Sequence, residues 1–224
     1  MPKKNKNQRP IDDLTGFKVR ENFKKFNQRD DIFCRSQWDL NIKSDRADAF
    51  FSGYFMPNAR SRKTDGFSQR DYALRNAAWH VTNILRDINR HETGRKEGFF
   101  DHFTTHDEGW MEPYPFENDE QATHDLRKAA KLFEADLFGV CEFDERWMYS
   151  GVYDEAIGDS KTIDLPEDLP FVIVIGESMD LGLTATVPSA LSGSATGLGY
   201  SYDSVTLITL AQYIRNLGYR AYAS

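Results

Sequence analysis

Cysteine and long hydrophobic runs are both scarce in this sequence. Its 224 residues include two cysteines, Cys34 and Cys141, and no CxxC motif. An iron–sulfur cluster usually takes four closely spaced thiolates, so this chain cannot by itself hold one through the common cysteine spacing. Two cysteines so far apart are expected to be buried small hydrophobic residues and not a disulfide.

Export signals and basic surfaces are also missing. No window reaches 18 apolar residues, and the first 30 residues contain neither a signal-peptide apolar run nor an arginine pair before one. We therefore expect a cytoplasmic protein without a transmembrane segment. The net charge of -7 and pI near 5.3 argue against nucleic-acid binding, which needs a basic surface. The short basic run KKNKNQR is interpreted as a solvated tail.

What is present is enough apolar material for a core, with 40% hydrophobic and 13% aromatic residues. Residues 1–65 are polar with scattered aromatics, which indicates an arm whose aromatic side chains anchor it on another surface. Residues 92–118 are rich in glycine, proline and acidic residues and are expected to form a loop. The predicted organisation is an N-terminal extension, residues 1–118, with one amphipathic helix, followed by an α+β unit at 119–224.

Hydrophobic periodicity places the elements. A helix is predicted over 68–91 with Ser68 as its N-cap, and a second over 119–135. Strands are predicted at 136–143 and at 171–178, the latter a buried β-branched run. A last helix carries Leu207, Leu210, Ala211 and Ile214 on one stripe and has Gly218 as its C-terminal cap. The final residues RAYAS begin to resemble another strand.

Two groups of polar residues suggest chemistry weakly. His102 and His106 could ligate a metal, but no third ligand lies at a convincing spacing, which favours a solvated or structural pair. Ser189, Ser192 and Ser194 lie outside any GxSxG motif and have no evident His or Asp partner, which favours helix and turn packing.

The segment SGSATGLGY, residues 192–200, is distinctive. The segment contains three glycines, Gly193, Gly197 and Gly199, which can be interpreted in two ways. They allow the backbone to adopt unusual dihedrals or to lie close to a large or flat group. Alternatively, they allow a helix of small residues to pack tightly against a neighbouring element. We expect Tyr200 to lie just ahead of the last helix, with Ser201 and Asp203 as capping candidates. The helix dipole would then favour its phenolate, although a tyrosine that merely anchors a helix start is the commoner case.

At these residues the chain resembles a known family. VPSALSGSATGLGYS followed by LAQYIRNLGYRA, with FGVCEFDERWMYS and LPFVIVIGESMD upstream, is similar to the front half of the corrinoid-binding domain of reductive dehalogenases. The similarity covers about residues 70–224.

The resemblance implies a nitroreductase-like fold that holds a cobamide base-off, followed by a ferredoxin-like domain with two [4Fe–4S] clusters. It implies an organohalide substrate and a proton donor, Tyr200. By the same resemblance, Ser194, Thr196, Gly197, Leu198 and Gly199 are expected to line the corrinoid side of the pocket.

The family pattern continues beyond these 224 residues into a basic residue near the tyrosine and into the cluster motifs. We therefore expect this chain to be the N-terminal portion of such an enzyme, with an incomplete domain, no activity alone and an unidentified electron donor. Two alternatives stay open: a flavin-dependent nitroreductase-like oxidoreductase, and a non-catalytic cofactor-carrier or interaction protein of the same fold.

Overall fold

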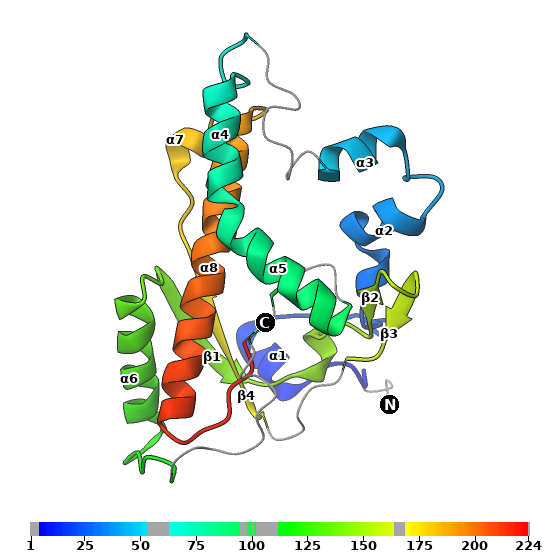
Figure 1. Ribbon diagram of the computed structural model, residues 1–224. Coiled ribbons are helices and arrows are strands. Elements are labelled where there is room, and N and C mark those ends of the chain that lie inside the picture. The colour runs from blue at the N-terminus through cyan, green and yellow to red at the C-terminus, as the bar shows by residue number, and fades with distance from the viewer. Residues whose placement is uncertain are drawn as a thin grey trace.

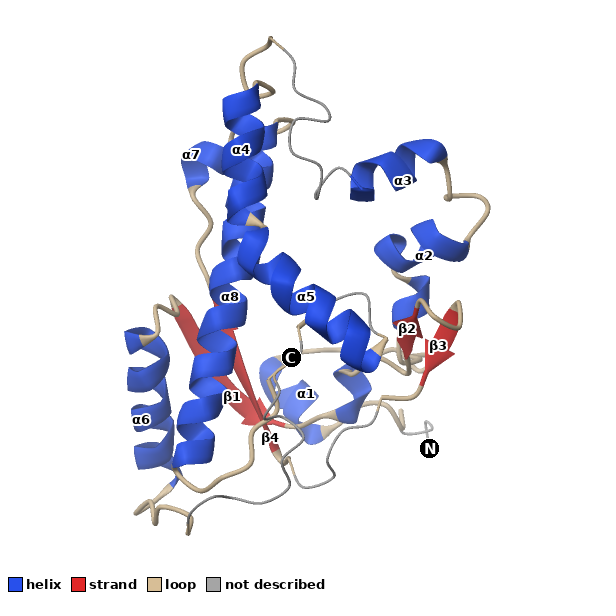
Figure 2. Ribbon diagram, viewed as in Figure 1, coloured by secondary structure: helices blue, strands red, loops and turns tan. Residues whose placement is uncertain are grey.

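The computed structural model describes residues 5–52, 63–94, 98–99, 101, 112–163 and 169–223. Helices and two small antiparallel sheets make up this part of the chain, in agreement with the predicted α+β class (Figure 1, Figure 2). None of the described helices is long and apolar enough to cross a membrane. The elements are α1 (Pro10–Thr15), η1 (Gln28–Asp30), α2 (Ile32–Trp38), α3 (Asp45–Ser52), α4 (Gln69–Ala78), α5 (His80–Thr93), α6 (Asp119–Leu132), β1 (Leu137–Glu142), η3 (Glu145–Trp147), β2 (Val152–Asp154), β3 (Asp159–Lys161), β4 (Phe171–Gly176), α7 (Leu181–Thr184) and α8 (Ala190–Asn216).

The longest helix, α8, starts well before Tyr200. Ser189 is its N-cap, and the side chains of Ser189 and Ser192 exchange hydrogen bonds with each other's backbone N–H groups. This capping box satisfies backbone donors at the first turn, so the helix begins there. The prediction that Tyr200 precedes the helix, with Ser201 or Asp203 as cap, is wrong. Gly218 follows the end of the helix with φ 84°, which confirms the predicted C-terminal cap.

The helix predicted over 68–91 is divided into α4 and α5 at Trp79. Ser68 caps α4 as predicted, in a capping box with Asp71. α4 then packs along the N-terminal part of α8 (Figure 1). Val81 and Ile88 of α5 are exposed, because α5 turns away from α8 after the break.

The main apolar core lies between α6, the C-terminal half of α8 and one face of the β1–β4 sheet. Ala130 and Leu210 are buried there, and Phe138 packs against them. The sheet is antiparallel, with register pairs from Leu137↔Gly176 to Glu142↔Phe171. β4 is only partly buried, contrary to the prediction, because Val174 points to the uncovered face of the sheet. Residues 220–223 form no strand, so the RAYAS prediction is wrong for the residues described.

The N-terminal segment is tied to the second half of the chain. The Arg146 guanidinium donates to both carboxylate oxygens of Asp12, at 2.7 and 2.9 Å, and to Asp144. Phe17 and Phe23 pack edge-on against Trp147, with ring centroids 5.4 and 5.5 Å away. The aromatics therefore anchor this segment, as the sequence indicated, although it contains the short helices α1 and α2 as well as extended chain.

Candidate functional site

The small-residue segment forms one side of the contact between α4 and α8. Trp79, at the end of α4, donates its indole N–H to the Gly193 carbonyl oxygen at 2.8 Å. A Cβ placed on Gly197 would lie 2.6 Å from Cγ of the same indole, closer than real Cβ contacts come. A Cβ placed on Gly193 would lie 3.2 Å from Cδ of Arg75, a tight contact but a milder one than at Gly197. None of Gly193, Gly197 and Gly199 has a positive φ, so these glycines provide space and not unusual dihedrals.

Serine hydroxyl groups also form hydrogen bonds at or near the contact between α4 and α8. Ser201 Oγ donates to the Ala78 carbonyl oxygen at 2.7 Å and accepts from the Thr82 N–H at 3.4 Å. Ser194 is 2% exposed, and its hydroxyl donates to the Ala190 carbonyl oxygen within α8. The two bonds of Ser201 satisfy backbone groups near the α4–α5 break, which would otherwise lose helical partners. The packing interpretation of the serines is therefore supported by their partners.

Tyr200 lies beside this contact and faces solvent. Its ring is 5.4 Å from the Trp79 ring, centroid to centroid, with an interplanar angle of 33°. The residue is 55% exposed, and its hydroxyl has no hydrogen-bond partner among the residues described. The phenol is thus held at its ring while its oxygen can meet another molecule.

The predicted cofactor-binding residues divide between different sides of α8. Ser194 and Gly197 are buried against the protein, whereas Thr196 and Leu198 are exposed and Gly199 is half-buried next to Met179. Successive helical residues are about 100° apart, so Thr196 and Tyr200 share a flank and Leu198 points away from them. A flat cofactor could meet Thr196 and Tyr200 together. Ser194 and Gly197 lie on the side of α8 that is buried, where Gly197 contacts Trp79 of the α4 end, and their role in cofactor binding stays a prediction.

An acidic group that sequence reasoning missed lies on the sheet side of α8. Burial raises the pKa of Glu177, which directly follows β4, and the charges of Asp136 and Asp203 add to this, while a hydrogen bond with Thr206 opposes it. One Glu177 carboxylate oxygen is buried without a partner among the described residues. Burial also raises the pKa of Asp203, one helical turn after Tyr200. The only sequence signal was that Glu177 ends an apolar strand.

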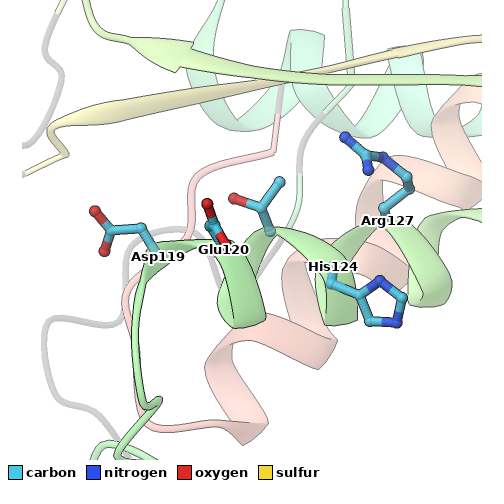
Figure 3. Close-up of a pocket in the computed structure, with 5 residues that line it drawn as sticks. Asp119, Glu120, His124 and Arg127 are labelled. Carbon is cyan, nitrogen blue, oxygen red and sulfur yellow. The ribbon is translucent and has the colours of Figure 1, made fainter.

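Other candidate sites are weaker. His102 and His106 lie outside the described residues, and no cluster of metal-ligating side chains occurs within them. A solvent-open depression of about 500 Å³ runs along α6 (Figure 3). Its lining residues, all from that helix, are Asp119, Glu120, Thr123, His124 and Arg127. Acidic residues in a first turn offset the helix dipole, which explains two of them without a ligand.

Comparison with known proteins gives a partial match. No protein-family model matches the chain. Tetrachloroethene reductive dehalogenase from Desulfitobacterium hafniense is 29% identical over 142 residues, which cover 48% of this chain and 26% of the relative. The enzyme of that name from Dehalobacter restrictus gives the same identity and coverage. The matched part of the chain thus spans 26% of the length of these curated relatives. At this level of similarity, the chain is a distant relative of the reductive dehalogenases.

Proposed function

We propose that this chain forms part of a cobamide-dependent reductive dehalogenase and that Tyr200 is its proton donor. The observation that carries the proposal is the exposed phenol of Tyr200, held by its ring on a long helix inside the segment that resembles the family. The relationship to tetrachloroethene reductive dehalogenases supports an oxidoreductase that acts on carbon–halogen bonds.

The proposed reaction replaces a halogen on carbon by hydrogen. The carbon–halogen bond takes up two electrons and one proton, and it yields a carbon–hydrogen bond and a halide ion. The bound cobamide would supply the reducing equivalents, delivered through two [4Fe–4S] clusters whose ligands are not in this chain. Tyr200 would donate its phenolic proton to the carbon that loses halide, and solvent would restore that proton.

The residues that would face the corrinoid are fewer than the sequence suggested. Thr196 shares a flank with Tyr200, and its hydroxyl could hydrogen-bond a corrin side chain. Gly199 and Leu198 could contact the cofactor only at its edge. The nitroreductase-like domain is proposed to begin at residue 119, with α4 from the preceding segment packed against its long helix.

Tyr200→Phe tests the role, and Tyr202→Phe is the matched control. Tyr202 is on the same helix and is also 55% exposed, but it points about 200° away around the helix. In the full-length, cobamide-loaded enzyme of which this chain is proposed to be a part, assayed with a chlorinated ethene, Tyr200→Phe should lower turnover per bound cobamide by about 10²–10⁴-fold, the usual contribution of a general acid. Tyr202→Phe should leave it unchanged. Turnover of Tyr200→Phe within about threefold of the parent would remove Tyr200 from catalysis.

A further inference from the structure

Three residues of α8 lie under one indole ring. Gly193, Gly197 and Tyr200 are spaced i, i+4 and i+7, so they follow one another along one side of the helix. Trp79 contacts all three: its N–H bonds to the Gly193 carbonyl oxygen, its five-membered ring fills the place of a Gly197 Cβ, and its ring lies against Tyr200. The indole therefore lies along α8 for about two turns.

The backbone of Trp79 is also held. Its N–H donates to the Arg75 carbonyl oxygen at 3.2 Å, and its own carbonyl oxygen accepts from the Asn83 N–H at 3.0 Å. Its neighbour Ala78 accepts the hydrogen bond of Ser201 from across the helix contact. The indole is thus fixed at both its backbone and its ring N–H, and it forms a rigid wall beside the phenol of Tyr200.

We propose that Trp79 is the positioning residue of Tyr200, and that Gly197 is glycine because this indole needs its space. The role rests on the proposed function, since positioning matters for catalysis only if Tyr200 donates the proton. A half-exposed tyrosine without such a wall can exchange rotamers. Displacing a catalytic group by about 1 Å can cost about 10²-fold in rate.

The position of Tyr200 can be measured without the cofactor. In the full chain labelled with 3-fluorotyrosine, the ¹⁹F resonance of Tyr200 is the one that disappears in Tyr200→Phe. The ring current of Trp79 displaces this resonance, so Trp79→Leu and Gly197→Ala should both move it towards the values of exposed tyrosines. Gly139→Ala is the control, because a Cβ there meets no atom within 4 Å. Trp79→Phe, which keeps a ring but lacks the N–H, is a milder variant that should shift the resonance less.

Kinetics in the full-length, cobamide-loaded enzyme that contains this segment then show whether Trp79 acts by positioning Tyr200 or only by packing. Trp79→Leu should lower kcat by about 10–100-fold with little change in KM, and should have no further effect once Tyr200 is Phe. An unmoved resonance in both Trp79→Leu and Gly197→Ala would overturn the proposal. So would an equal loss of kcat with and without the Tyr200 hydroxyl, because Trp79 would then act by another route. If Tyr200→Phe alone has no effect on turnover, Tyr200 is not the proton donor, and the positioning role fails with that part of the proposed function even if the resonance moves.

Discussion

Two glycines of α8, two residues apart, should respond in opposite ways to the same substitution. At Gly197 a Cβ would lie 2.6 Å from the Trp79 Cγ and from its Nε1. At Gly199 the nearest atom to a Cβ would be Met179 Cγ, at 3.7 Å, which is an ordinary contact. Both residues are inside one helix, so the change in helix propensity is the same at both.

The magnitudes follow from three contributions. Replacing glycine by alanine in a helix interior stabilises by about 1 kcal/mol. Forcing a methyl group into a filled site costs about 1–3 kcal/mol, and losing the Trp79–Gly193 hydrogen bond adds about 0.5–1.5 kcal/mol. Gly197→Ala should therefore lower the free energy of unfolding by about 0.5–3.5 kcal/mol, while Gly199→Ala should raise it by about 0.5–1 kcal/mol.

Urea unfolding followed by far-UV circular dichroism measures both changes, with m-values compared to detect altered unfolded states. In a Trp79→Ala background the indole is gone, and Gly197→Ala should become neutral or stabilising. The reasoning is refuted if the two alanine variants change stability with the same sign, or if the loss at Gly197 persists without Trp79.

Two further predictions concern charged groups. Hydrogen bonds from Arg146 hold the pKa of Asp12 and of Asp144 below the usual range. The ion pairs therefore stabilise the folded protein fully at pH values above the ordinary aspartate pKa of about 3.9. This stability is lost as the pH falls through the lowered pKa values of the folded protein. Arg146→Met should therefore make residues 5–23 sensitive to limited proteolysis at neutral pH. The difference in cleavage rate between the variant and the parent should become smaller in acid. Equal cleavage of both proteins at neutral pH would contradict this. Burial raises the pKa of Glu177, so its ionised form costs stability at neutral pH, and the parent should regain stability as the pH falls through that raised value. Glu177→Gln should be the more stable protein at neutral pH and equal to the parent below the ordinary glutamate pKa of about 4.3, and a pH-independent difference would count against the assignment.

Local patterns predicted α6, β1 and β4 well, because strong signals mark the ends of these elements. The helix predicted from residue 119 is α6, and the predicted strands correspond to β1 and β4 within two residues at each end. Ser68 and Gly218 are caps because hydroxyl acceptors and left-handed glycines satisfy the free backbone groups of helix ends, whatever the tertiary context.

Tertiary packing decided the features that the sequence misplaced. Three glycines close together lower helix propensity, which is why the start of α8 was expected after them. Their cost is offset by contacts with α4 that no local pattern reveals. The break at Trp79 was missed for the same reason, because AAWHV continues a helical pattern and only the contact with Gly193 and Ser201 indicates where the chain must turn.

The segment SGSATGLGY therefore has two kinds of residue, although the sequence presents it as one motif. A surface already filled by an indole cannot also face a second flat group, so the burial of Gly197 under Trp79 assigns that side of α8 to helix packing. Tyr200 lies at the edge of the same contact, with its ring against the indole and its hydroxyl towards solvent. A proton donor benefits from this arrangement, because a group must be held in place to react efficiently and yet be accessible to its substrate. The glycines serve the first requirement, and the position of Tyr200 beside them serves the second.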